Sequence, residues 1–371
     1  MPTEDTFYGH LQRRGVNRRD FLKFCTVMAA SLGLGSGATN QIAEALETKK
    51  RLPVIWRHLQ ECTCCTESFI RTQHPIAADI ILNMISLDYD ETLMAAAGHH
   101  AEAAAQKVME ENKGNYILAI EGSIPTKDDG IYCVLAGRTA VDILKEEAKN
   151  AKAIIAWGSC ATVGCVQSAN PNPTGAVAVQ DIIKDKPIIN VPGCPPIAEV
   201  MAGVITHLLT FERLPELDSQ GRPKAFYGHR IHDKCNRRAY FDAGLFVESF
   251  DDQGAKEGWC LYKVGCKGPN TYNSCSNLEW NGGLSYPIKS GHPCIGCSEK
   301  GFWDNTGGQS LYTHLSDVPG LKIGMNVDTF GAAAVGAAVA GAAVHAGLSA
   351  VTKKAHDKAE AGKSNKNSMG G

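Results

Sequence analysis

Three cysteines stand within four residues, directly after the first strongly apolar run of this 371-residue chain. Cys62, Cys64 and Cys65 lie in Glu-Cys-Thr-Cys-Cys-Thr-Glu-Ser, which follows Leu-Pro-Val-Ile-Trp. A disulfide needs Cα atoms about 4.4–6.8 Å apart with converging Cβ vectors, so such close neighbours are poor partners for one another. They can, however, all contact one polymetallic centre. The motif therefore predicts a fold that holds iron and sulfur at the end of a strand.

Apolar runs alternate with helix-like stretches between Leu52 and Phe211. The strand-like runs are 52–56, 116–120, 153–157 and 187–191, and the helix-like stretches include 136–149 and 196–211. This alternation predicts an α/β fold with a doubly wound, largely parallel sheet. Ligands of such sheets bind beyond the carboxyl ends of the strands.

Further cysteines follow two other predicted strands. Cys160 and Cys165 come after the run at 153–157, and Cys194 comes after the run at 187–191. Because the carboxyl ends of parallel strands lie at one edge of a sheet, we expect these thiols to join the first three in one site.

The size and charge of the chain limit the other possibilities. A chain of 371 residues can bury a full core and hold more than one folded unit. The net charge of −2 gives no indication of nucleic-acid binding. The alternative use of 14 cysteines is a disulfide framework, but such frameworks stabilise small domains that lack a core. The apolar strand-like runs favour metal binding instead.

Residues 1–45 are predicted to form a twin-arginine signal peptide. Asn17-Arg18-Arg19-Asp20-Phe21-Leu22-Lys23 precedes a modestly apolar stretch over 24–34, and Ala43-Glu44-Ala45 fits a small-residue cleavage site. The alternative is a basic amphipathic helix of the mature protein. Cleavage would make Leu46 the first mature residue and would remove Cys25. The twin-arginine route carries folded proteins, which suits a protein that receives its cofactors before export.

The regular pattern fades between about 215 and 317, where two more groups of metal-ligating residues occur. The first group is His232, Cys235, Cys260 and Cys266, and the second is Cys275, Cys294 and Cys297. Thiolates suit iron–sulfur clusters, in which an imidazole can replace one thiolate. Zinc is the alternative for the first group. The second group lacks an evident fourth ligand, and a three-iron cluster needs only three thiolates. Metal binding would contribute folding free energy to this segment.

Residues 329–351 form a 23-residue run without Lys, Arg, Asp or Glu. That length can span roughly 30 Å of hydrocarbon, and the many small residues suit packing against partner helices. The alternative is an Ala-rich surface or linker helix. Lys353, Lys354 and Lys358 mark the cytoplasmic side. We therefore expect a linker at 319–328, a transmembrane helix at 329–351 and a cytoplasmic tail at 352–371, disordered from Lys363 onward.

Taken together, these motifs resemble the small subunit of NiFe-hydrogenases, and most closely the membrane-bound, oxygen-tolerant uptake group. The resemblance extends over nearly the whole chain. It rests on Glu-Cys-Thr-Cys-Cys-Thr-Glu-Ser, Val-Pro-Gly-Cys-Pro-Pro, Arg-Ile-His-Asp-Lys-Cys, Gly-Cys-Lys-Gly-Pro and Gly-His-Pro-Cys-Ile-Gly-Cys. It implies a flavodoxin-like domain over 46–225 and an irregular iron–sulfur cluster-binding domain over 226–318.

The resemblance also implies which residues hold three clusters. The proximal cluster, nearest the catalytic metal, would be held by Cys62, Cys65, Cys160 and Cys194. The distal 4Fe–4S cluster would be held by His232, Cys235, Cys260 and Cys266. The medial 3Fe–4S cluster would be held by Cys275, Cys294 and Cys297, with Pro287 where a fourth ligand would stand.

Two more thiols match the supernumerary cysteines of the oxygen-tolerant group. Cys64 and Cys165 stand where oxygen-sensitive relatives usually have glycine, which implies a six-cysteine 4Fe–3S proximal cluster in place of 4Fe–4S. Glu121 matches a carboxylate that can act as an alternate iron ligand, although a glutamate at a strand end is usually just solvated. Cys133 matches no ligand and is expected to be a buried free thiol.

The resemblance implies an electron-relay subunit of a membrane-bound uptake hydrogenase. Hydrogen would be split in a separate large subunit, within a heterodimer or a dimer of heterodimers. Electrons would pass from the proximal to the medial to the distal cluster, and then through a membrane cytochrome b to quinone. The globular part would lie on the periplasmic side of the inner membrane. The alternative is a stand-alone exported iron–sulfur electron carrier or a zinc-stabilised binding protein.

Overall fold

The computed structural model describes residues 6–13, 15–31, 35, 37–48, 51–73, 75–304, 312 and 327–367. The chain divides into two compact units, Met1–His314 and Leu315–Gly371, and each is described by itself.

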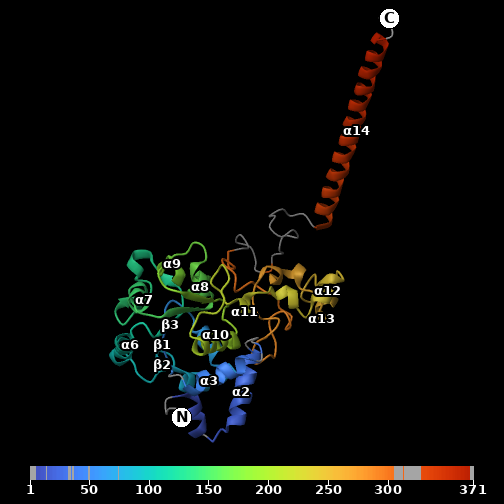
Figure 1. Cartoon of the computed structure of the whole chain (residues 1–371). Coiled ribbons are helices and arrows are strands. Elements are labelled where there is room, and N and C mark those ends of the chain that lie inside the picture. The colour runs from blue at the N-terminus through green and yellow to red at the C-terminus, as the bar shows by residue number, and fades with distance from the viewer. Residues whose placement is uncertain are drawn as a thin grey trace. The chain divides into compact units, whose positions relative to one another are not determined.

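Five parallel strands form the centre of the first unit (Figure 1). They are β1 (Leu52–His58), β2 (Ile85–Asp90), β3 (Ile117–Glu121), β7 (Ala153–Trp157) and β9 (Ile188–Val191). Their order across the sheet is β2-β1-β3-β7-β9, with every neighbouring pair parallel. This is the 2-1-3-4-5 order of flavodoxin-like folds. The predicted α/β fold and its doubly wound sheet are therefore confirmed.

Alternate residues of these strands build two cores on opposite faces of the sheet. Trp56 and Trp157 belong to one core, whereas Ile55 and Ile154 belong to the other. The helix α10 (Ala198–Phe211) contributes to the first core. Two helices, α6 (His99–Glu111) and α7 (Ala140–Ala148), contribute to the second. Figure 1 shows α6 and α7 on one side of the strands and α10 on the other. Burial on both faces explains the continuous apolar runs of the sequence.

Short elements complete this part of the chain. The helices are α4 (Cys64–Phe69), α5 (Ala77–Asp79), α8 (Gly158–Val163) and α9 (Val179–Ile182), with a π-helix η1 (Ile80–Met84) and 3₁₀ turns η2 (Lys127–Gly130) and η3 (Cys165–Ser168). Two-residue strands pair as β4 (Ile124–Pro125) with β8 (Ala176–Val177) and as β5 (Val134–Leu135) with β6 (Arg138–Thr139). The helix α4 follows β1 and α8 follows β7, so both begin at the carboxyl edge of the sheet.

The segment from 215 to 304 has little regular structure, as predicted. Its helices are α11 (Lys224–Tyr227), α12 (Arg238–Asp242) and α13 (Gln253–Glu257), and its 3₁₀ turns are η4 (Ile231–Lys234), η5 (Tyr262–Val264) and η6 (Gly268–Asn270). Its buried side chains, such as Tyr227, Val247 and Ile288, belong to the same core as Trp56 and Trp157. The irregular segment therefore shares a core with one face of the sheet.

Three helices precede the sheet: α1 (Phe7–Arg13), α2 (Arg18–Ser31) and α3 (Ala38–Thr48). The helices α2 and α3 contact α10, and α1 contacts η1. The predicted cleavage site at 43–45 lies within α3. The signal peptide stays a prediction.

The second unit contains one long helix, α14 (Val327–Asn367). Its part Gly331–Lys354 is 24 residues long, has a mean hydropathy of 1.7 and is exposed. By length and composition it is a candidate membrane span, which overlaps the predicted 329–351. The helix continues to Asn367, so the expected disorder from Lys363 is wrong up to that residue. The predicted linker lies outside the described residues up to position 326.

Candidate metal centres

The six cysteines of the predicted proximal site come together at the carboxyl edge of the sheet. We call Cys62, Cys64, Cys65, Cys160, Cys165 and Cys194 the proximal group. Cys62 and Cys65 stand at the start of α4 or just before it, after β1, and Cys160 lies in α8 after β7. The sulfur atoms of Cys165 and Cys194 are 3.9 Å apart. Three separate strand ends therefore meet at one site, as the sequence predicted.

Gly158 allows two of these segments to approach one another. Its φ is +77°, and a Cβ atom there would lie 2.4 Å from the sulfur of Cys65 and 3.4 Å from the carbonyl oxygen of Gly193. Any side chain would therefore collide with a predicted ligand. A glycine after β7 was visible in the sequence, but its role depends on this contact.

Burial and neighbouring groups disfavour the ionisation of Cys62 and Cys65 in the proximal group. Burial, with smaller contributions from the Cys64 and Cys160 thiols, raises the pKa of Cys62 to about 12. Burial also raises the pKa of Cys65, and the charges of Glu121 and Cys160 add to that effect. A cluster of iron ions would supply the positive charge that such crowded thiolates require. The donor set therefore fits an iron–sulfur cluster.

Two thiols of the group, Cys160 and Cys194, behave differently, because the hydrogen-bonding contact of each with Cys165 lowers its pKa. Cys165 donates to the sulfur of Cys194, which lowers the pKa of Cys194 to about 7. Cys165 itself interacts with Cys160 and Cys194, and these contacts raise its own pKa. Gln167 adds a second polar contact, because its Nε2 lies 3.3 Å from the sulfur of Cys160. No motif in the sequence analysis pointed to Gln167.

Cys165 occupies a backbone conformation that favours glycine. Its φ is +52°, in the left-handed region, and it directly follows Gly164 at φ +89°. A residue with a Cβ costs roughly 1–2 kcal/mol in that region. The neighbouring Ser168 hydroxyl binds the Cys165 carbonyl oxygen at 2.9 Å. The cysteine is therefore kept at a position where the backbone alone would select glycine.

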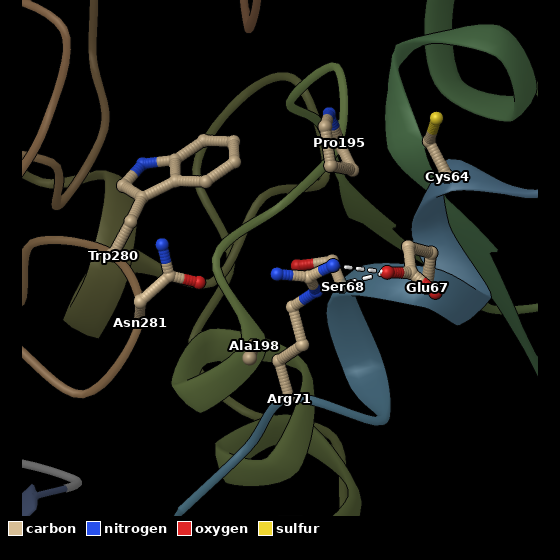
Figure 2. Close-up of a pocket in the computed structure, with 8 residues that line it drawn as sticks. All are labelled: Cys64, Glu67, Ser68, Arg71, Pro195, Ala198, Trp280 and Asn281. Carbon is tan, nitrogen blue, oxygen red and sulfur yellow. Dashed lines mark hydrogen bonds and ion pairs between the residues drawn. The ribbon is translucent and has the colours of Figure 1, made fainter.

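Cys64 lines a cavity of about 220 Å³ beside the proximal group (Figure 2). Arg71 and Glu67 form an ion pair in this cavity, with Nε and Oε1 3.0 Å apart, and Trp280 and Asn281 lie across from them. Cys64 is exposed, whereas Cys165 is buried. The two supernumerary thiols therefore lie at different depths in the group.

Glu121 is buried and is not simply solvated. Its carboxylate accepts hydrogen bonds from the backbone N–H groups of Cys65 and Thr66 at 2.9 and 3.1 Å. The Thr66 hydroxyl and the Trp56 indole donate to the same carboxylate at 2.7 and 3.3 Å. Burial raises the pKa of Glu121, whereas His58 opposes that shift. The carboxylate thus lies beside the predicted ligand Cys65, held by four donors.

His58 and Glu61, which the sequence analysis missed, form a buried group with Glu121. One possible ligand atom from each residue lies within 4.8 Å of the others. Although burial lowers the pKa of His58, contacts with Asp90 and Glu61 raise it to about 10. A protonated imidazole has no lone pair for a metal. In its protonated form the imidazole forms an ion cluster with Glu61 and Glu121 beside the proximal group.

The three cysteines of the predicted medial site line a cavity of about 100 Å³. We call Cys275, Cys294 and Cys297 the medial group, and Pro287 lines the same cavity, as do Trp280 and Ile288. Burial raises the pKa of Cys275 to about 11 and that of Cys297 to about 12. The structure therefore brings together three thiols and the proline that was predicted to replace a fourth ligand.

The four residues of the predicted distal site also lie together. We call His232, Cys235, Cys260 and Cys266 the distal group. Burial, with contributions from the charges of Cys266 and Cys235, raises the pKa of Cys260 to about 11. A Cβ atom at Gly268 would lie 3.4 Å from the Cys266 sulfur and 3.8 Å from the backbone nitrogen of His232. Burial and then Arg238 lower the pKa of His232, which favours the neutral imidazole that binds metals.

The three groups follow one another through the protein. The charge of Cys194, in the proximal group, contributes to the raised pKa of Cys297 in the medial group. The charge of Cys266, in the distal group, contributes to the raised pKa of Cys294 in the medial group. The medial group therefore lies between the other two.

All 14 cysteines are free thiols, which argues against the disulfide alternative. Cys133 was expected to be a buried free thiol and is half-buried. Burial raises its pKa to about 11, and the charges of Glu91 and Glu61 contribute. It lies outside the three groups.

Two protein families match separate parts of the chain. Residues 227–309 match the C-terminal part of the NiFe/NiFeSe hydrogenase small subunit. Residues 62–208 match the 20 kDa subunit of NADH ubiquinone oxidoreductase. The first match covers the medial and distal groups, and the second covers the proximal group.

Proteins of known identity are similar over nearly the full length. The uptake hydrogenase small subunit of Afipia carboxidovorans is 60% identical over 357 residues, which cover 96% of both chains. The uptake hydrogenase small subunit of Cupriavidus necator is 59% identical over 358 residues, covering 96% of this chain and 98% of that one. A solved structure of the Ni-Fe-Se hydrogenase from Desulfomicrobium baculatum is 34% identical, with a TM-score of 0.67, covering 72% of this chain and 100% of that chain.

Proposed function

The chain belongs to the family of NiFe-hydrogenase small subunits, and on that premise we propose that it relays electrons from hydrogen oxidation toward a membrane quinone. The nickel–iron active site lies in a separate large subunit. Small subunits of this family carry iron–sulfur clusters. In this chain the electrons would pass through three clusters and leave through a membrane cytochrome b.

The observation that carries this proposal is the order of the three thiol groups. Cys194 of the proximal group lies close enough to Cys297 of the medial group for its charge to act on that thiol. Cys266 of the distal group acts in the same way on Cys294 of the medial group. A relay needs such a sequence of neighbouring redox centres. A stand-alone carrier needs only one centre, and a zinc-stabilised protein needs no connected series.

We assign one cluster to each group. The medial group, with three cysteines and Pro287 in one cavity, suits a 3Fe–4S cluster. The distal group, with one imidazole and three thiols, suits a 4Fe–4S cluster. The proximal group would hold a 4Fe–3S cluster with all six thiols, and Glu121 beside Cys65 would serve as an alternate iron ligand. When bound, such clusters supply one-electron steps, and the 4Fe–3S form would supply two in succession.

The six-thiol assignment gains support from the strained backbone of Cys165. Its φ of +52° favours glycine, so the cysteine is retained against a conformational cost. Strain of this kind is typical of functional positions. We propose that Cys64 and Cys165 make the hydrogenase tolerant of oxygen.

The apolar part of α14 supports a location in the inner membrane. Its 24 residues, Gly331–Lys354, can cross the hydrocarbon, and Lys353 and Lys354 at its end favour the cytoplasmic side for the C-terminus. The globular unit would then face the periplasm after export by the twin-arginine route. The relay would then lie beside a membrane acceptor.

The test is to purify the complex from membranes and analyse its metals during a redox titration. We expect a nickel-containing large subunit to copurify, and electron paramagnetic resonance to resolve three iron–sulfur centres. A chain that carries zinc in place of iron, or that purifies without a nickel-containing partner, would refute the proposed function. Signals from fewer than three centres would refute the assignment of one cluster to each group.

A further inference from the structure

The first three helices are folded onto the globular unit, although they contain the predicted export signal. In α2 the side chains of Phe21, Cys25 and Met28 are at most 2% exposed, and in α3 Ile42 and Leu46 are at most 1% exposed. All five belong to the same core as α10 and one face of the sheet. The predicted signal therefore contributes to the core of the uncleaved chain.

The surface that receives these helices is α10. Eleven of its 14 residues are buried, and its sequence is apolar nearly all round. A helix of that kind needs cover on more than one side. The sheet provides one cover, and α2 and α3 contact α10 as a second. Removal of residues 1–45 would withdraw most of that second cover.

The parts of the export signal differ in their accessibility. The side chain of Arg18 is 64% exposed, although its Nη1 lies 3.1 Å from Oε1 of Glu47. In contrast, Phe21 and Cys25, which follow the arginine pair, are fully buried. Ala43 and Ala45 of the predicted cleavage site are 5% and 2% exposed and lie within a helix. The arginines are exposed, whereas Cys25 and Met28 of the apolar stretch and the two alanines of the predicted cleavage site are buried.

The helix α1 packs against the start of α2. The ring of Tyr8 lies 4.4 Å from that of Phe21, and the ring of Phe7 lies 5.5 Å from that of Phe24. Phe7 and Tyr8 are 2% and 4% exposed. Phe7 and Tyr8 themselves lie outside the arginine motif, the apolar stretch and the cleavage site. Their partner Phe21 belongs to the arginine motif, and their partner Phe24 belongs to the apolar stretch.

We propose that α1–α3 form a docked leader, which closes the apolar export segment and the cleavage site until it is released from α10. The inference rests on the proposed twin-arginine export. A buried helical site must open locally before a peptidase can bind it, and a buried apolar segment cannot enter a membrane. Export and processing therefore begin from the released leader, while the arginines remain accessible in both states.

The test uses Cys25 as a native reporter in the full-length precursor with its clusters in place. Cys25 is fully buried, and burial raises the pKa of its thiol to about 12. We expect iodoacetamide to alkylate it about tenfold or more slowly than in the urea-unfolded chain, as quantified by mass spectrometry of its peptide. Alkylation at the unfolded rate would overturn the proposal, and this result needs no variant.

A variant then tests whether α1 holds the leader in place. We expect Phe7→Ser with Tyr8→Ser to raise the alkylation rate of Cys25 about tenfold, because it removes aromatic packing outside the motif. The matched control Gln12→Ser changes an exposed residue of the same helix and should keep the native rate. Equal rates in the double variant and the control would contradict the role of α1–α3 as a releasable leader.

An export assay separates the docking proposal from the export proposal. In cells, the double variant should be processed faster than the Gln12→Ser control, because its leader is released more often. Slower or equal processing would contradict closure by docking. If Arg18→Lys with Arg19→Lys does not block processing, the twin-arginine route is refuted, while protection of Cys25 still decides whether the leader docks.

Discussion

At the scale of single residues, Cys165 separates conformational cost from chemical role. A residue with a Cβ costs roughly 1–2 kcal/mol in this left-handed conformation. Glycine avoids that cost, but it loses about 0.5–1 kcal/mol more in conformational entropy when the chain folds. The second effect offsets part of the first. Replacement of Cys165 by glycine should therefore leave the stability of the fold within about 1 kcal/mol of the native value. Any loss of function in that variant would then be chemical in origin.

The first prediction concerns oxygen. Cys64→Gly with Cys165→Gly should keep hydrogen oxidation under anaerobic conditions, because Cys62, Cys65, Cys160 and Cys194 still suit a 4Fe–4S cluster. Under oxygen the variant should lose activity and not recover, since the second rapid electron is missing. Activity is recorded during a pulse of oxygen for the native and variant complexes. Cys133→Gly removes a thiol outside the three groups and should behave as the native protein. Identical recovery in the native protein and the double variant would refute the six-thiol cluster.

The second prediction concerns a buried charge in β1. Arg57 is fully buried, with Nε 2.7 Å from Glu147 and Nη1 2.8 Å from Glu102. Removal of Arg57 leaves the fully buried Glu147 carboxylate without this ion-pair partner, whereas Glu102 keeps Arg138, so Arg57→Met should cost about 3–5 kcal/mol of unfolding free energy. Urea unfolding of the complex measures this change. Lys107→Met, which breaks the exposed pair with Glu111, should change it by less than about 0.5 kcal/mol.

The contrast between thiols and ion pairs explains what the sequence could predict at this scale. The cysteines of the proximal group occur in short motifs after apolar runs. Their convergence therefore followed from the parallel direction of the predicted strands, whose carboxyl ends lie at one edge of the sheet. Arg57 pairs with residues 45 and 90 positions away, and only the packing of α6 and α7 against β1 brings them together. The same reason hid His58, whose partners Asp90 and Glu121 lie at the ends of other strands.

At the scale of elements, burial decided which strands were predictable. Four of the five strands gave continuous apolar runs, because helices cover both faces of the sheet there. The missed strand β2 lies at the edge of the sheet and reads Ile-Ser-Leu-Asp-Tyr-Asp. Its middle residues are only partly buried, so polar side chains interrupt the apolar pattern. The segment from 215 to 304 had no regular pattern to predict, because its described secondary structure consists of short helices and single turns.

The third prediction concerns the junction of β7 and α8. Gly158→Ala would place a Cβ atom 2.4 Å from the sulfur of Cys65, at a φ of +77°. The variant should lose proximal iron, while the medial and distal signals persist. Iron analysis and electron paramagnetic resonance of the purified complex measure this. Gly137→Ala provides the matched control, because its φ is +79° but a Cβ there meets nothing within 4 Å.

The control separates backbone strain from collision. Both variants force alanine into the left-handed region at a cost of roughly 1–2 kcal/mol. If Gly137→Ala also loses proximal iron, strain and not contact with Cys65 explains the loss. If Gly158→Ala keeps its proximal signal, the thiol of Cys65 is not held where the structure has it.

At the scale of the whole molecule, the sheet and the irregular segment of the first unit together hold the three thiol groups in one series. The flavodoxin-like sheet presents the proximal group at its carboxyl edge, and the irregular segment shares a core with one face of that sheet. The backbone carbonyl of Cys297 accepts a hydrogen bond from the Ser159 hydroxyl, which links the medial group to α8. The packing of the two parts therefore fixes the spacing between neighbouring centres.

The last prediction tests that path at its outer end. His232 is half-buried, packs edge-on against Phe241 with ring centroids 4.6 Å apart, and provides the distal group with its one imidazole. His232→Ala should lower dye- or quinone-linked hydrogen oxidation about tenfold, a typical effect of perturbing a metal site. Hydrogen isotope exchange at the large subunit should stay at the native rate, because it needs no electron flow through the distal group. His229→Ala, an exposed neighbour, should change neither rate. A residue that acts only in electron transfer affects acceptor-linked hydrogen oxidation and leaves isotope exchange unchanged. An equal loss of both activities in His232→Ala would therefore show that His232 supports the fold and not electron transfer from the distal group.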